Sequence, residues 1–91
     1  MPIQISIPTP LRRFASGADS ALVEAATLAD AIAALDNLYP ELVARLRDEH
    51  GRLRRHVRLF VNEEDVRFLQ DEATPLTNGD RVAIIPAIAG G

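Results

Sequence analysis

The segment that most constrains the fold is the apolar run RVAIIPA at residues 81–87. It follows the sequence TNGD at residues 77–80, whose Asn-Gly pair is a strong signal for a tight turn. A strand that is apolar nearly throughout is typical of the middle of a sheet, where both faces are covered. The sequence IQISI at residues 3–7 alternates apolar and polar side chains, as a half-buried strand does. We therefore expect the first and last strands to be neighbours in the middle of one mixed sheet.

A second strand is expected soon after the first. Pro8 and Pro10 end the first strand, and the turn-rich sequence RRFASGADSA, residues 12–21, is expected to form a loop. The short segment ALVEA, residues 21–25, predicts a strand. Its closeness in sequence to the first strand predicts that the two form a hairpin.

Two helices are predicted after this hairpin. Thr27 lies three residues before Asp30, a spacing that resembles a capping box at a helix N-terminus. Apolar residues then recur at helical spacing and predict one face that packs on a sheet or on another helix. These residues are Leu28, Ala31, Ile32, Ala34, Leu35 and Leu38. Pro40 interrupts this helix and begins a shorter one, PELVARLRDE, which Gly51 ends.

The second half of the chain predicts further strands. The sequence HVRLFVN, residues 56–62, is rich in β-branched and aromatic residues, NEED at residues 62–65 predicts a turn, and VRF at residues 66–68 predicts a brief strand. In the first of these strands, one side is formed by Val57, Leu59 and Val61 and the other by Arg58, Phe60 and Asn62.

The order of elements predicts an α+β fold, with a mixed sheet of about five strands that carries one main helix and a short second helix on one face. This is the order of the β-grasp, or ubiquitin-like, arrangement, although the order alone leaves other α+β folds open.

Catalytic and metal-binding patterns are missing from the sequence. The absence of cysteine removes disulfides, thiolate metal sites and cysteine nucleophiles. His50 and His56 do not have the spacing of a zinc site, and no serine lies in a G-x-S-x-G sequence. We expect the carboxylates of Glu63, Glu64 and Asp65 to be hydrated in their turn rather than to act as an acid–base pair. We therefore expect no enzyme activity, no bound metal and no cofactor bound by the chain itself.

The charge is acidic overall but has one basic cluster. The net charge is −3, and all ten basic residues are arginine. The cluster comprises Arg52, Arg54, Arg55, His56 and Arg58. A nucleic-acid surface usually has a basic field over a whole face with aromatic residues between the charges, so we expect no nucleic-acid partner. The cluster is interpreted as a solvated strand edge or as a docking patch for an acidic partner.

No signal peptide and no membrane-spanning apolar run is recognisable in the sequence. We therefore expect a cytoplasmic protein without a membrane partner. We expect the chain to be a monomer when free.

The chain ends in AIIPAIAGG, with two glycines after the last strand. We assign residues 1–87 to one β-grasp domain and residues 88–91 to a flexible C-terminal tail. If extended, the residues after Pro86 reach about 17 Å beyond the fold. Glycine has no Cβ, so the backbone of another protein can close tightly around a di-glycine end. We predict that the following residues enter the active sites of partner enzymes: Ile88, Ala89, Gly90 and Gly91.

These segments resemble the ThiS/MoaD family of ubiquitin-like sulfur carriers. The sequence TNGDRVAIIPAIAGG is similar to the end of family members, which close with an acid-containing turn, a strand, a proline and Gly-Gly. The resemblance covers essentially the whole chain, including the helix position and the strand order. The segments SIPTPLRR, VNEEDVRF and IIPAIAGG are most similar to the branch of the family that serves cysteine biosynthesis in actinobacteria.

The resemblance implies how the chain carries sulfur. An E1-like adenylyltransferase and sulfurtransferase uses ATP and magnesium to adenylate the Gly91 carboxylate, and sulfur then replaces AMP to form a thiocarboxylate. In the cysteine branch, a pyridoxal-phosphate cysteine synthase presents an aminoacrylate to this thiocarboxylate, and a zinc metalloprotease cuts the carrier–cysteine adduct. The residues agree on one point, because a chain without cysteine can carry sulfur covalently only on its carboxyl terminus.

Several alternatives stay open at this point. The chain could be a molybdopterin synthase small subunit or a sulfur donor for thiamine or another thio-metabolite. The molybdopterin alternative is weakened because Ala87 follows Pro86, where that branch usually has a second proline, and because Asp65 lies in the turn that would help build its apolar patch. Alternatives from other classes are a ubiquitin-like protein modifier and an interaction module whose Gly-Gly end is incidental.

Partner enzymes must also recognise the body of the domain, because the tail has almost no side chains. The candidate docking residues are Arg58, Phe60, Ile85 and Pro86. An exposed aromatic side chain flanked by arginine is a typical interface anchor. The alternative is that Phe60 packs under the second helix and that the arginines are merely solvated.

Overall fold

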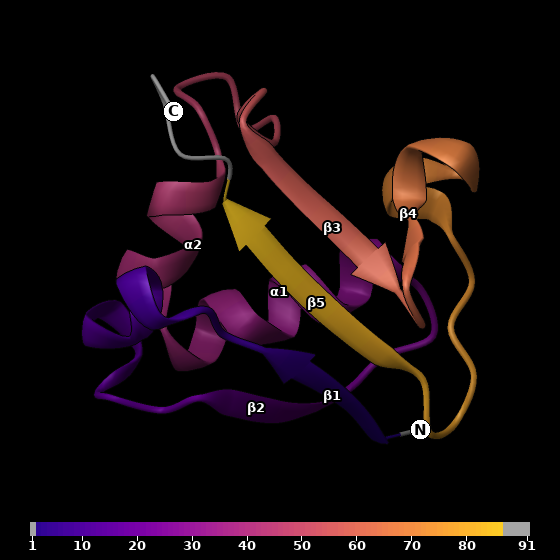
Figure 1. Cartoon of the computed structure of the whole chain (residues 1–91), viewed down its shortest axis with the longest axis horizontal. Helices are drawn as coiled ribbons and strands as arrows, with labels where there is room; N and C mark the ends of the chain where they lie inside the picture. Colours follow the sequence, from indigo (N-terminus) through magenta and orange to yellow (C-terminus); the bar gives the residue numbers. More distant parts are fainter. Residues whose placement is uncertain (1, 87–91) are drawn as a thin grey trace.

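The computed structural model describes residues 2–86, and Figure 1 shows two α-helices covering one face of a twisted sheet. The sheet has the strand order β2-β1-β5-β3-β4. Its strands are β1 (Pro2–Ser6), β2 (Ser20–Glu24), β3 (Val57–Val61), β4 (Glu64–Asp65) and β5 (Arg81–Pro86). The central strand β5 is parallel to β1 and antiparallel to β3. This arrangement confirms the prediction that the first and last strands are neighbours in the middle of a mixed sheet.

The hairpin of β1 and β2 is also confirmed, since the two strands pair antiparallel along their full length. The expected loop between them is wrong in its first part, because Thr9–Ala15 forms a 3-10 helix, η1. Pro10 lies in the first turn of η1, where a helix does not need its missing N–H. Ser16 and Gly17 then take φ values of 55° and 83°, which end the helix.

The first α-helix, α1 (Leu28–Leu38), begins as predicted. The Thr27 hydroxyl accepts a hydrogen bond from the Asp30 backbone N–H at 3.2 Å and so caps the helix. The prediction for Leu38 is wrong, because its side chain is 52% exposed. At this end of α1 the side chain of Tyr39, and not that of Leu38, packs against the core.

The second α-helix, α2 (Pro40–Leu46), is shorter than predicted. Arg47 already has an extended backbone and forms an isolated β-bridge with Leu53, so the helix ends well before Gly51. Within residues 2–86, no helix combines the length and the apolar character that crossing a membrane requires.

The region after β3 differs most from the prediction. Asn62 and Glu63 have positive φ values, 49° and 74°, and form a tight turn, as predicted. The second half of the turn predicted at residues 62–65 is wrong, because Glu64–Asp65 pairs with β3 as the strand β4. The predicted strand VRF is wrong, because Val66–Phe68 forms a short 3-10 helix, η2, and a second one, η3, follows at Asp71–Ala73. The Asp65 carboxylate accepts the Arg67 backbone N–H at 2.9 Å, which caps η2 and turns the chain away from the sheet.

One hydrophobic core lies between the sheet and the helices. Its largest fully buried side chains are Ile3, Ile5, Ile7, Leu28, Leu35, Leu42 and Leu46. Leu59, Val82 and Ile84 extend this core along β3 and β5. The predicted α+β architecture, with a main and a short helix on one face of a five-stranded mixed sheet, is therefore confirmed.

Candidate functional site

The end of β5 brings the chain out at the middle of the sheet. Ala83 pairs with Ser6 of β1, and Pro86 pairs with Val57 of β3. The four predicted tail residues, together with the predicted domain boundary after residue 87, lie outside the described residues. The described part of the candidate site is therefore the surface of the domain beside Pro86.

The open face of the sheet carries three of the predicted docking residues. Arg58 pairs with Ile85 across β3 and β5, and Phe60 pairs with Ala83. Side chains of directly opposed residues lie on the same face of a sheet. This is the face opposite the core, because the alternate residues of both strands are buried under the helices. The arrangement brings the Arg58, Phe60 and Ile85 side chains together on one accessible surface.

A shallow depression of about 700 Å³ lies on this open face. Phe60 is half-buried in it, and Ile85 at its rim is 46% exposed. The hypothesis that Phe60 packs under the second helix is therefore wrong. Pro86 is on the other face of β5, since it pairs with Val57, which packs against the core. The docking role of these residues stays a prediction.

A polar clamp at the other end of this face holds β3 and β5 in register. The Asn62 amide nitrogen donates to the Asp80 carboxylate at 2.9 Å, and the Arg81 backbone N–H donates to the Asn62 amide oxygen at 3.0 Å. Asp80 also accepts the Thr77 backbone N–H at 2.8 Å and closes the predicted Asn-Gly turn. The Thr77 backbone N–H and the Asn62 amide hold the pKa of Asp80 below its usual range.

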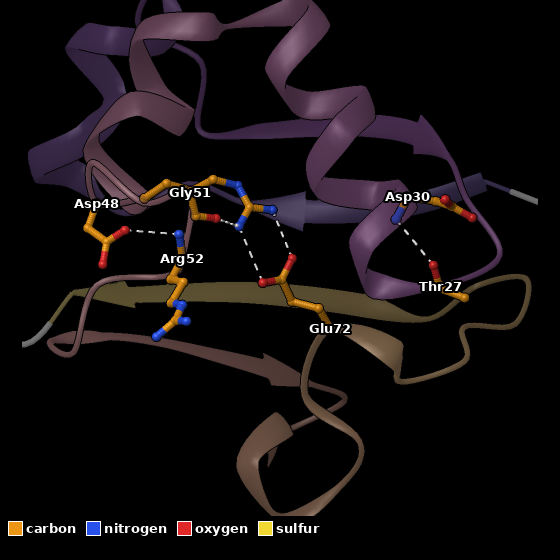
Figure 2. Close-up of polar contacts among 7 residues, drawn as sticks. Thr27, Asp30, Asp48, Gly51, Arg52 and Glu72 are labelled. Carbon is orange, nitrogen blue, oxygen red and sulfur yellow. Dashed lines mark hydrogen bonds and ion pairs between the residues drawn. The ribbon is translucent and has the colours of Figure 1, made fainter.

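Four residues of the predicted basic cluster lie on the loop between α2 and β3, and the fifth, Arg58, lies in β3. Figure 2 shows the Glu72 carboxylate reaching this loop, where it accepts from Arg47 Nη2 at 2.8 Å and from Nη1 at 3.3 Å. Arg47 Nη1 also donates to the Gly51 carbonyl at 2.7 Å. The Asp48 carboxylate accepts the Arg52 backbone N–H at 3.0 Å, a bond that lowers the pKa of Asp48. These contacts tie the loop to η3 and give the cluster a defined position.

Asp65 is not the hydrated carboxylate that the sequence led us to expect. It is 8% exposed, and its Oδ2 lies 3.1 Å from Arg67 Nη2. The Arg67 guanidinium lowers the pKa of Asp65 through this hydrogen bond. Glu63 and Glu64 are exposed, as predicted. The three carboxylates therefore have different surroundings, and Asp65 has a structural contact.

Among residues 2–86, no group of three or more His, Cys, Asp or Glu side chains is placed to hold a metal ion. His50 is exposed, and its Nε2 lies 3.7 Å from the Glu49 carboxylate. The described part of the site presents the open face around Phe60 as an accessible surface.

The family model of the ThiS family matches residues 5–91. The chain belongs to the ThiS family. The sulfur carrier protein CysO of Mycobacterium tuberculosis is 42% identical over 93 residues, which cover 100% of both chains. Small archaeal modifier protein 3 of Haloferax volcanii is 38% identical over 66 residues, covering 72% of this chain and 71% of the modifier.

The fold comparison agrees with this family membership. A chain in the crystal structure of the Amycolatopsis orientalis BexX/CysO complex matches with a TM-score of 0.89 at 36% identity. The match covers 98% of this chain and 99% of that one. The predictions of a β-grasp fold and of a sulfur carrier are confirmed. A carrier of the ThiS family is a protein on which enzymes act, and it is not itself an enzyme.

Sequence reasoning missed part of the surface that this ThiS-family chain presents. Ser6, Ala83 and Arg81 also line the depression around Phe60. Ala83 could have been found, because it lies two residues before Ile85 in a strand and must share its face. Ser6 could also have been found, because it lies on the polar side of the alternating residues 3–7, which were expected beside the last strand.

Proposed function

We propose that this chain is a sulfur carrier of cysteine biosynthesis and that it carries sulfur as a thiocarboxylate on Gly91. The observation that carries the proposal is the full-length match to the CysO sulfur carrier, which includes the Gly-Gly end. The position of β5 supports it, because a central strand anchored on both sides leads directly into residues 87–91. We further propose that the protein works in the cytoplasm as a monomer when free.

In the proposed cycle, the Gly91 carboxylate attacks the α-phosphorus of ATP on an E1-like enzyme with magnesium and displaces pyrophosphate. A sulfur nucleophile supplied by that enzyme or its donor then displaces AMP and leaves the thiocarboxylate. The acceptor is proposed to be a pyridoxal-phosphate cysteine synthase, and a zinc metalloprotease is proposed to release the product. The crystallised BexX/CysO complex supports the idea that such a carrier docks on a second protein.

The role of this chain in each step is to bind and to present its end. The rigid β3–β5 pair sets the point from which the tail extends, and the open face around Phe60 provides the contact surface. Glycine at the last two positions lets the tail enter a narrow channel because no side chain obstructs it.

Intact mass spectrometry tests the proposal directly. The purified chain is incubated with the E1-like enzyme of its own organism, ATP, magnesium and a sulfur source. We expect a mass increase that equals the replacement of one oxygen by one sulfur. Deletion of Gly90 and Gly91 should abolish this product while changing the free energy of unfolding by less than about 0.5 kcal/mol. Activation of the truncated chain would contradict the assignment of the Gly91 carboxylate.

A second candidate function is protein modification, which the match to a small archaeal modifier protein favours. The same activated carboxylate would then form an amide bond with a lysine side chain of another protein. The chain has no lysine, so it cannot form lysine-linked chains of itself. Recovery of the chain joined to other proteins in cells would favour this function, whereas the free thiocarboxylate favours sulfur transfer.

A further inference from the structure

A second pocket lies at the edge of the sheet and shares only Arg58 with the surface formed by Arg58, Phe60 and Ile85. β4 pairs only with Phe60 and Val61, so the first part of β3 pairs with β5 on one side and, within the described chain, has no neighbouring strand on its outer edge. A pocket of about 180 Å³ lies beside this uncovered edge. Its apolar lining is formed by Leu53, Val57, Leu59 and Val66. We call it the arginine pocket because arginine side chains form most of the rest of its lining.

Four arginines from three separate segments line the arginine pocket. They are Arg54 and Arg55 of the loop before β3, Arg58 of β3 and Arg67 of η2. Asp71 is the one acidic residue among the lining residues. In the described part of the chain, Arg67 forms an ion pair with Asp65, while Arg54, Arg55 and Arg58 form none. A chain with a net charge of −3 thus gathers four arginines and one acidic residue around one pocket, and the charge of Arg58 also acts on the carboxylate of Asp65.

The arginine pocket is held in shape before any partner binds. The Arg54 backbone N–H donates to the Leu46 carbonyl at 2.8 Å, and the Val57 N–H donates to the Arg54 carbonyl at 3.0 Å. The Arg47–Glu72 ion pair at 2.8 Å fastens the same loop to η3 (Figure 2). Binding to a preformed surface avoids the entropy cost of ordering a loop.

The arginine pocket also lies next to the point where the described chain ends. Val57 and Arg58 line the pocket and pair with Pro86 and Ile85, the last two residues of β5. An enzyme that takes residues 87–91 into its active site must approach this end of the sheet, since five extended residues span only about 17 Å. The arginines therefore lie within reach of the rim of that enzyme's active site.

We propose that the arginine pocket binds the carboxylate side chains of an acidic segment on the enzyme that receives residues 87–91. The inference rests on the proposed carrier function and names the chemistry of its partner. Guanidinium groups bind carboxylates in bidentate geometry, and the apolar lining accommodates the methylene groups of Glu and Asp. Nucleic acid is disfavoured because no aromatic side chain lines the pocket for base stacking.

Charge reversal on the full-length chain tests the proposal. We expect Arg54→Glu/Arg55→Glu to slow association with the E1-like enzyme about tenfold at roughly 0.05 M salt, and to differ much less at roughly 0.5 M salt. The matched control is Arg13→Glu/Arg45→Glu, which makes the same charge change at Arg13 and Arg45, the two arginines stacked on Phe14. An equal effect of the two double variants would overturn the proposal, because it would reflect net charge alone.

A second measurement is independent of any enzyme. NMR titration of the labelled full-length chain with a hexaglutamate peptide should shift the amide signals of residues 53–59 and 66–67. Arg54→Glu/Arg55→Glu should remove these shifts, and a hexalysine peptide should not produce them. Shifts spread evenly over all arginines, or tighter binding of a single-stranded oligonucleotide at the same residues, would overturn the proposal.

The two proposals fail in different ways. If no thiocarboxylate forms on the unmodified chain, the proposed function is wrong, while the peptide titration still decides the pocket's preference for carboxylates. If the thiocarboxylate forms at the same rate on the unmodified chain and on Arg54→Glu/Arg55→Glu at low salt, the carrier function holds and the arginine pocket is not the docking site of the activating enzyme.

Discussion

The two faces of β5 contact different surroundings. Val82 and Ile84 are 2% and 3% exposed and form part of the core under the helices. Ala83 and Ile85 lie between them in sequence, yet they line the open face, where Ile85 is 46% exposed. One strand can therefore stabilise the fold with one face and present a surface to other proteins with the other, because successive side chains point to opposite faces.

The core face should show the largest effect on stability. We expect Ile84→Ala to lower the free energy of unfolding by about 2–5 kcal/mol, because it removes buried methyl groups and leaves a cavity. Chemical denaturation measures this loss. The matched control is Ile85→Ala, the same change on the other face. Similar losses for the two variants would show that the faces do not differ.

Phe60 should have an intermediate effect on stability and a larger effect on binding. Because it is half-buried on the open face, we expect Phe60→Ala to cost about 1 kcal/mol of unfolding free energy. We expect the same variant to weaken binding to the E1-like enzyme by about 2 kcal/mol, as an interface anchor does. Titration calorimetry with the E1-like enzyme measures the loss of binding free energy, and chemical denaturation measures the loss of unfolding free energy. Unchanged binding together with a loss typical of a core phenylalanine would contradict the role of the open face.

The polar clamp between β3 and β5 should make a smaller, pH-dependent contribution to stability. Hydrogen bonds lower the pKa of Asp80 in the folded chain, so its carboxylate stabilises the fold above the unfolded pKa of about 3.9. This contribution is lost as the pH falls through the lowered folded pKa. Asp80→Asn should therefore reduce stability at neutral pH and match the unmodified chain at strongly acidic pH. Asp36→Asn, on α1, is the control, and an equal pH profile for the two variants would contradict the prediction.

The rim of the open face should show the smallest effect on stability. We expect Ile85→Ser to change the free energy of unfolding by less than about 0.5 kcal/mol, because the side chain is already half in solvent. Association with the E1-like enzyme should nevertheless weaken. A loss of stability close to that of Ile84→Ala would remove the distinction between the two faces.

Much of this architecture could be predicted because it depends on local periodicity. The alternation in residues 57–61 placed Arg58 and Phe60 on the face opposite Leu59, and the structure agrees. Thr27 and Asp30 lie within one helical turn of each other, so their hydrogen bond needs no tertiary information. The side chains on the open face were therefore recognisable from the sequence, whereas the depression around Phe60 was not.

The arginine pocket could be predicted only in part. The cluster of Arg54, Arg55 and Arg58 is visible in the sequence, but its approach to Arg67 is not. That approach depends on the Arg47–Glu72 ion pair, which joins residues 25 positions apart, and on the turn that Asp65 imposes. No local pattern specifies such a contact.

Local patterns were enough to predict the main order of strands and helices, the central place of residues 81–86 and the capped start of α1, and the Gly-Gly end indicated a carrier. The tertiary structure decided that Leu38 is exposed, that Asp65 is buried against Arg67, that α2 ends at Leu46 and that residues 66–68 leave the sheet. Local conformational preferences amount to only about a few tenths of a kcal/mol per residue, so tertiary interactions easily outweigh them. Burial and ion pairing between segments distant in sequence have larger energies, and they exist only once the chain has folded.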